Sequence, residues 1–200
     1  MTKKIFTAFA ALFTAVFLGG CANDAITYRA TLHFEATPRE LEGAGKPGSP
    51  LIHDFAMPDE IARKNLDPKY TPRRYRSLEA AVATEEHFLD ASAVKATYAV
   101  GADKWDMVQL RVLLTPTATN RLYAQTITRV QDGGNRLFLF VNGNPVGSLI
   151  LSEQVKTGAL LFGINLPYKN EEELKGQAFD LQNDLRKTIL ILRKQREGGK

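Results

Sequence analysis

The sequence predicts an α+β fold, a mostly antiparallel sheet with two principal helices. Three observations support this prediction. Asn142-Gly143 follows an apolar run and is typical of a two-residue hairpin, because both residues of a type I′ turn need positive φ. Thr115-Pro116 is typical of a helix start, with threonine as the N-cap and proline in the first turn. Asn170, with Glu173 three residues later, begins a second helix whose apolar residues recur at helical spacing.

The N-terminus has the pattern of a lipoprotein export signal. Lys3 and Lys4 precede an apolar segment over 5–18, which is shorter than the roughly 20 residues that a spanning helix needs. The segment ends in Leu18-Gly19-Gly20-Cys21, the lipobox pattern of bacterial lipoproteins, and a cysteine thiolate is the nucleophile that accepts a diacylglycerol group. We therefore expect residues 1–20 to be removed and Cys21 to be lipidated. The alternative is an ordinary secreted protein with a chance cysteine.

The composition of the mature chain narrows its location and its partners. A cysteine that carries two or more acyl chains is held stably at a membrane. Ala22 stands where aspartate would signal retention in the inner membrane, which favours the periplasmic side of the outer membrane. Loss of Lys3 and Lys4 lowers the net charge from +4 to +2, which does not favour a nucleic-acid partner. Because Cys21 is the only cysteine, we expect no zinc cluster or thiol nucleophile, and no cofactor.

The first part of the mature chain is expected to be rich in loops. After a lipidated tether over 21–25, residues 26–76 form an N-terminal strand followed by a long excursion. The strand is predicted over Ile26–Glu35, where apolar and polar residues alternate. Over 37–71 proline and glycine are frequent, and one or two helical turns are expected near Asp59–Asn65. The glycines near Lys46 do not have the spacing of a phosphate-binding loop.

A basic run between Arg63 and Arg76 is interleaved with tyrosines. Arginine forks bind phosphate groups of lipids or the carboxylates of an acidic protein, so this run is the candidate partner-binding segment. The alternative is a solvated loop, because runs of charge are commonly just hydrated. The candidate contact residues are Lys69, Tyr70, Arg73, Arg74, Tyr75 and Arg76.

Residues 77–193 are expected to form the main α+β domain, with a basic tail over 194–200. Leu78–Ala83 fits a strand better than a helical turn, and Asp90–Ala93 is expected to start a short helical turn. Glu85, Glu86, His87 and Asp90 lack the spacing of metal ligands, so we expect a surface turn there and no metal site. Strands are predicted over Lys95–Val100, Trp105–Leu114, Arg136–Val141, Pro145–Leu151 and Ala159–Leu166.

Two helices complete the predicted domain. The first is expected to run from Pro116 to about Val130, ending at Asp132-Gly133-Gly134. Its apolar face is predicted to contain Ala118, Leu122, Ile127 and Val130, and that of the last helix Leu174, Ala178, Leu181, Leu185, Ile189 and Leu192.

This order of elements resembles the head region of the first periplasmic domain of SecD, the protein-export membrane subunit. The resemblance covers about Leu78–Leu192 and is carried by LRVLLTP, RLFLFVNGNPVGSLIL, Gly158, the EEEL start of the last helix, and HFLDASAVKATYAV. The chain departs from the family at Val146-Gly147-Ser148 and Thr157-Gly158, where the family usually has a proline and a Gly-Gly pair. The resemblance implies a SecD periplasmic-head-like fold and a habit of binding polypeptide, without the motor activity of the membrane helices.

Two classes of function remain. The first is a lipid-anchored periplasmic binding or interaction module, whose partner is an envelope protein or an anionic lipid. The second is an envelope enzyme of the hydrolase class, with a site assembled in space. None of the serines lies in a nucleophile elbow; they are Ser49, Ser77, Ser92, Ser148 and Ser152. We therefore expect a binding module, no enzyme and no catalytic residue.

Overall fold

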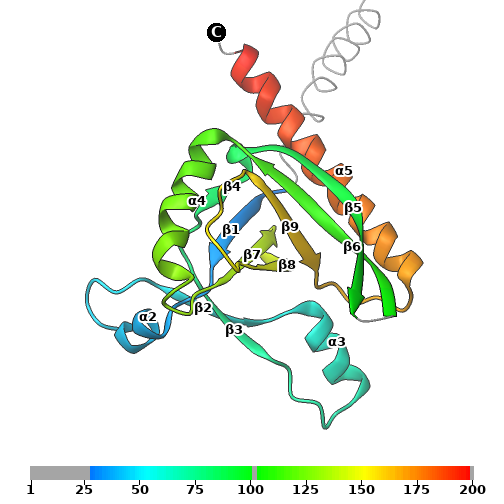
Figure 1. Cartoon of the computed structure of the whole chain (residues 1–200), viewed down its shortest axis with the longest axis horizontal. Helices are drawn as coiled ribbons and strands as arrows, with labels where there is room; N and C mark the ends of the chain where they lie inside the picture. The colour runs from blue at the N-terminus through cyan, green and yellow to red at the C-terminus, as the bar shows by residue number, and fades with distance from the viewer. Residues whose placement is uncertain (1–27, 101–102, 199–200) are drawn as a thin grey trace, which may run out of the picture.

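A curled seven-stranded antiparallel sheet and two long helices give the chain the α+β fold that the sequence predicts (Figure 1). The computed structural model describes residues 28–100 and 103–198. The strand order is β4-β1-β7-β8-β9-β6-β5. The strands are β1 (Ala30–Phe34), β4 (Ala83–Thr84), β5 (Phe88–Val100), β6 (Asp103–Leu114), β7 (Arg136–Val141), β8 (Asn144–Ile150) and β9 (Ala159–Ile164).

One face of this sheet and the two helices form the core. The helices are α4 (Pro116–Arg129) and α5 (Glu171–Gly198), and α5 runs along β5 and β6 (Figure 1). Alternate residues of β1 are buried, as the sequence predicts for this strand. Leu32 of β1 and Leu110 of β6 lie in one apolar cluster with Leu122 of α4 and Leu185 of α5. Burial of this apolar surface is the main term that stabilises the sheet against both helices.

The predicted hairpins are present. Asn142 and Gly143 connect β7 to β8 with φ of 51° and 78°, the positive values that a type I′ turn requires. β5 and β6 form the other hairpin, but β5 already begins at Phe88. The helical turn expected over Asp90–Ala93 is therefore wrong, because these residues pair with β6 and Ala91 is fully buried.

Helix α4 begins as predicted, but its buried face differs by one residue. The side chain of Thr115 accepts a hydrogen bond from the backbone N–H of Ala118. Ile127, expected in the core, is 38% exposed, whereas Thr126 is 0% exposed. The Thr126 hydroxyl donates to the carbonyl of Tyr123 and accepts from the N–H of Val155, so its burial leaves no polar group unpaired.

Helix α5 is longer than expected. Its Asn170 cap accepts a hydrogen bond from the N–H of Glu173 at 2.9 Å, as predicted. The helix continues to Gly198, so residues 194–198 belong to it instead of forming a separate tail. In the part of the chain that the structure describes, no helix combines the length and the apolar character needed to cross a membrane. The buried residues of α5 include the predicted Leu174, Ala178, Leu185, Ile189 and Leu192, with Thr188 and Ile191 in addition.

The segment expected to be a long excursion is largely regular structure. It contains α2 (Pro38–Gly43), β2 (Ile52–Ala56) and α3 (Pro58–Leu66), and only α3 coincides with the helical turns predicted there. A capping box between Thr37 and Glu40 explains α2. β2 forms because it pairs with β3 (Arg74–Leu78), which is a contact between residues distant in sequence.

The strand expected over Leu78–Ala83 is also wrong. β3 ends at Leu78, and β4 begins only at Ala83. Between them the N–H of Val82 donates to the carbonyl of Leu32, which fixes the turn on β1. The short 3₁₀ helix η1 (Glu85–His87) follows β4, where a surface turn was expected.

Candidate binding surface

The predicted partner-binding segment belongs to a small lobe on the outer face of the sheet. We use the word lobe for residues 52–78, which form β2, α3 and β3 (Figure 1). Phe55 of β2 and Tyr75 of β3 are register partners and both pack on Phe138 of β7, with ring centroids 5.1 and 5.6 Å away. Phe140 is also 5.1 Å from Phe55. This aromatic contact attaches the lobe to β7.

The alternation of side chains along β3 separates the basic run into two groups. One group lies on the inner face of β3, where Tyr75 packs against β7 and Ser77 is buried. The other group, Arg74 and Arg76, is exposed on the opposite face. Arg74 donates from Nε to Asp54 of β2 at 2.6 Å. Arg76 makes no ion pair with any residue that the structure describes, and the same holds for exposed Lys69. These two cations are therefore available to an external anion.

Tyr75 lies under two guanidinium groups. The Cζ atom of Arg73 is 5.1 Å from the centroid of the Tyr75 ring, and that of Arg136 is 5.5 Å away. We call these three residues the Arg–Tyr cluster. The carboxyl of Glu35 is close to both cations. Burial raises the pKa of this carboxyl, while the charges of Arg136 and Arg73 act in the opposite direction.

A chain of hydrogen bonds connects this cluster to the start of α3. Arg136 donates to the hydroxyl of Ser148 at 3.3 Å, and Ser148 donates to the Asn165 side-chain carbonyl at 3.0 Å. The backbone carbonyl of Asn165 then accepts from the N–H of Asp59 at 3.1 Å. The lobe is thus held at β7 by aromatic packing and at the end of β9 by polar contacts.

The turn between α3 and β3 is organised by one carboxylate. Glu60 accepts from the hydroxyl of Tyr70 and, at 3.1 Å, from the backbone N–H of Arg73. These two hydrogen bonds, that from Tyr70 first, hold the pKa of Glu60 below its usual value. Tyr70 therefore shapes the turn, and its hydroxyl is already used within the chain.

The structure brings only part of the predicted contact set together. Arg73 and Tyr75 share the Arg–Tyr cluster, and Arg76 extends from the exposed face of the same strand. Arg136 and Glu35 were missed, because they come from β7 and from the end of β1. Two features were readable in the sequence: Arg136 begins a predicted strand, and Glu35 ends one. Whether these residues bind a partner stays a prediction.

Two of the three histidines make hydrogen bonds within the fold. His33 donates from Nδ1 to the carbonyl of Leu78 at 2.9 Å and accepts at Nε2 from the Thr31 hydroxyl at 2.8 Å. Burial lowers the pKa of His33. His87 accepts at Nδ1 from the backbone N–H of Thr84, within the metal-like sequence Glu85, Glu86, His87. Within residues 28–100 and 103–198, no group of three or more His, Cys, Asp or Glu side chains is placed to hold a metal ion.

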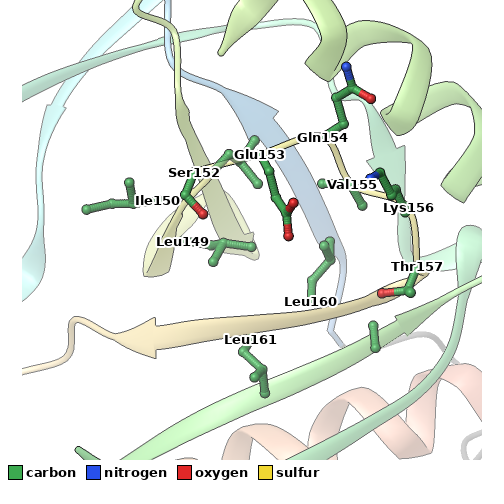
Figure 2. A pocket seen from close by; sticks show the side chains of 12 residues that line it. Leu149, Ile150, Ser152, Glu153, Gln154, Val155, Lys156, Thr157, Leu160 and Leu161 are labelled. Atoms are coloured by element: carbon green, nitrogen blue, oxygen red, sulfur yellow. The ribbon is translucent and has the colours of Figure 1, made fainter. Parts of the chain in front are cut away.

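A pocket of about 280 Å³ lies where β8 and β9 diverge (Figure 2). These two strands share only the register pairs Gly147↔Ile164 and Ser148↔Gly163, after which the segment 151–158 turns away from the sheet. Leu149, Leu160 and Val155 line the apolar part, and Figure 2 shows the carboxylate of Glu153 beside them. No histidine lines this pocket.

The predicted lipidation site Cys21 lies outside the described residues, as do the predicted signal segment 1–20 and the tether 21–25. The described chain begins at Tyr28, whose backbone carbonyl accepts from the hydroxyl of Thr188 on α5 at 3.0 Å. β1 then leads to Glu35, which bridges to Ser77 of the lobe. β1 therefore connects the α5 end of the domain to the lobe.

No family model matches the sequence, and no curated protein matches it. The structure is similar to a solved structure of SecDF, a membrane component that enhances protein export, with a TM-score of 0.44 and 16% sequence identity. The similar region covers 89% of this chain and 68% of that chain. The α+β class of the fold is shown by the sheet and helices themselves.

Proposed function

We propose that this chain is a lipid-anchored interaction module of the cell envelope, held by Cys21 at the periplasmic side of the outer membrane, which binds an envelope protein through its lobe. The observation that carries this proposal is the course of β1. Tyr28, seven residues after Cys21, is bonded to α5, and Glu35 at the other end of the strand touches the lobe.

The reach of the chain sets the distance between anchor and domain. Seven residues extend over at most about 25 Å, so the lipid on Cys21 lies within about 25 Å of Tyr28 at the α5 end of β1. A strand rises about 3.3 Å per residue, which puts Glu35 about 23 Å from Tyr28. Figure 1 agrees, because the lobe and the C-terminal part of α5 lie at opposite ends of the view. The anchor therefore enters the domain at the end of β1 opposite to the lobe, and we take a protein as the partner of the lobe.

The chemistry of the lobe favours an acidic partner surface. Lys69, Arg73 and Arg76 are exposed, and Arg76 and Lys69 have no ion pair among the described residues. Arginine pairs with carboxylates through two parallel hydrogen bonds, and arginine and tyrosine are enriched in protein interfaces. The Arg–Tyr cluster supplies both residue types on one surface.

The anchor is tested with a Cys21→Ser variant of the full chain. We expect this variant to keep its signal segment and to lose metabolic labelling with palmitate, because serine has no thiol to accept the diacylglycerol group. The natural chain should be labelled and should fractionate with the outer membrane. Normal processing of the variant, or an unlabelled natural chain, would refute the lipid anchor.

The lobe is tested by placing a photoreactive amino acid at position 76 in living cells. A matched control carries the same group at Arg121, an exposed arginine of α4 outside the lobe. We expect a protein adduct from position 76 only, and its loss when Arg73 is changed to Glu. The same adduct from both positions, or one that survives Arg73→Glu, would contradict the proposal.

A further inference from the structure

The two halves of α5 have opposite charge. In residues 186–198 the charged side chains are Arg186, Lys187, Arg193, Lys194 and Arg196 against Glu197. In residues 171–185 they are Glu171, Glu172, Glu173, Asp180 and Asp184 against Lys175. This distribution suits the helix dipole, whose contribution is confined to the first and last turns. The dipole therefore accounts for Glu171–Glu173 and for Arg196, but not for cations farther from the end.

Three cations of the basic half surround an exposed leucine. Leu190 is 52% exposed, and Lys187, Arg193 and Lys194 are three or four residues away, so all lie on one side of the helix. We call these four residues the α5 basic patch. Among the described residues none of its cations forms an ion pair.

Neighbouring arginines of the same helix are used within the fold. Arg186 binds Asp90 of β5 through Nε at 2.9 Å, and Arg196 donates to the carbonyl of Glu86 at 2.7 Å. The cations of the α5 basic patch are thus those of this half that form no hydrogen bond or ion pair with the described residues. A leucine at their centre adds apolar surface that water would otherwise hydrate.

The α5 basic patch lies at the point where the described chain begins. Thr188, which binds the carbonyl of Tyr28, is within six residues of every member of the patch, or about 9 Å along the helix. Glu171 is seventeen residues away from Thr188, or about 26 Å. The point where the described chain begins is therefore closer to the basic half of α5 than to its acidic half.

We propose that the α5 basic patch rests on the anionic phospholipid headgroups of the membrane that carries the lipid anchor, with Leu190 in the interfacial layer. This inference depends on the lipid anchor of the proposed function and adds the orientation of the domain. The contact holds α5 down on the membrane and directs the lobe away from it.

The physical basis is the attraction of cations to an anionic surface. Each lysine or arginine near such a surface strengthens membrane binding about fivefold, and the attraction falls off within the Debye length of about 10 Å at 0.1 M salt. A single buried leucine adds a smaller apolar contribution. The patch should therefore contact vesicles that contain phosphatidylglycerol and should not contact vesicles made only of phosphatidylcholine.

The test uses the full lipidated chain in vesicles of known composition. Because acylation consumes the thiol of Cys21, a Leu190→Cys variant offers one thiol for an apolar, environment-sensitive fluorophore. A matched chain carries the fluorophore at Arg76→Cys on the lobe. We expect lipid-borne quenchers in phosphatidylglycerol vesicles to quench position 190 at least fivefold more than position 76, and 0.5 M salt to reduce the difference.

Charge variants test whether the quenching at position 190 depends on the α5 basic patch or only on the net charge of the chain. Lys187→Gln, Arg193→Gln and Lys194→Gln together should abolish the quenching at position 190. The control removes three exposed cations elsewhere, with Lys46→Gln, Lys64→Gln and Lys169→Gln, and should preserve it. Equal quenching in phosphatidylcholine, equal loss in both triple variants, or stronger quenching at position 76 would overturn the inference. A chain that fails to float with either kind of vesicle would instead refute the lipid anchor.

Discussion

Arg129 and Glu40 form a two-point bond between α4 and α2. The Nη2 atom of Arg129 is 2.6 Å from Oε1 of Glu40, and Nη1 is 3.1 Å from Oε2. Nη1 also donates to the backbone carbonyl of Glu35. Burial alone would raise the pKa of Glu40, but the hydrogen bonds from Arg129 and Thr37 outweigh it and lower the pKa below its usual value. Glu40 is therefore bound in its charged form.

Glu40→Gln should lower the free energy of unfolding at pH 7 by about 1–3 kcal/mol, because Arg129 loses a charged partner in a largely buried place. The folded pKa lies below the unfolded one, so the contribution is complete above the unfolded pKa of about 4.3 and is lost as the pH falls through the folded value. Urea unfolding at pH 7 and pH 3 should show the difference shrinking. Glu42→Gln on the exposed side of α2 is the control, and a pH-independent deficit would contradict the assignment.

Glu35→Gln should affect the free energy of unfolding at pH 7 in the opposite direction to Glu40→Gln. Burial raises the folded pKa of Glu35, so its contribution to stability is largest below the unfolded pKa and is lost as the pH rises through the folded pKa. At pH 7 the amide variant should therefore be at least as stable as the natural chain, and at pH 3 the two should agree. Thermal unfolding checks this, and a clear loss at pH 7 would mean that the charges of Arg136 and Arg73 dominate.

Gly143→Val should destabilise the fold by about 1–3 kcal/mol, because a β-branched residue is forced to positive φ. No atom lies within 4 Å of a Cβ placed there, so the cost is conformational and not a steric clash with a neighbour. Gly176→Ala is the matched control, since this glycine is equally open but helical, and it should gain about 0.5–1 kcal/mol. A loss near zero at position 143 would contradict the turn assignment.

Phe55→Ala should detach the lobe from β7. Phe55 contacts Phe138 and Phe140, and removal of a buried phenylalanine costs about 3–5 kcal/mol. Limited proteolysis should then cut within 52–78 while the sheet core stays intact. Ile61→Ala on the exposed side of α3 should leave the cleavage rate unchanged, and equal protection of the Phe55 variant would show that the polar contacts at Asn165 suffice.

Thr188→Val should cost about 1–3 kcal/mol, because the part-buried carbonyl of Tyr28 loses the donor that the buried Thr188 supplies. The substitution keeps the volume of the side chain, so packing is little changed. Hydrogen exchange should report faster opening at the start of β1, and Thr117→Val, at an exposed position of α4, is the control. Unchanged protection of β1 would mean that its pairing with β7 and β4 holds this end of the strand without the Thr188 contact.

The elements that the sequence predicts well have signals within a few residues. The Asn142-Gly143 turn, the Thr115 cap and the Asn170 cap are local, and the structure has all three. By contrast, β2 has the sequence Ile-His-Asp-Phe-Ala, without clean alternation, and is a strand because β3 lies beside it. Local propensity has no information about such a partner.

The candidate surface was only half predictable for the same reason. The basic run marked Arg73 and Tyr75, but Arg136 reaches the same ring from a strand sixty residues later. The run also included Tyr70, whose hydroxyl is used by Glu60. Composition identifies which side chains are charged, whereas pairing within the fold decides which of them remain available.

The pairing of β1 has a consequence for the order of folding. Ala30 lies opposite Val141 and Phe34 opposite Leu137, so the first strand of the described chain completes its ladder with residues made more than a hundred positions later. Pairings so distant in sequence form slowly, because a long loop must close before they stabilise anything. We expect the chain to remain without the β1–β7 ladder until β7 has been synthesised. A protein built in this way keeps its N-terminal strand unpaired until most of the chain has been made.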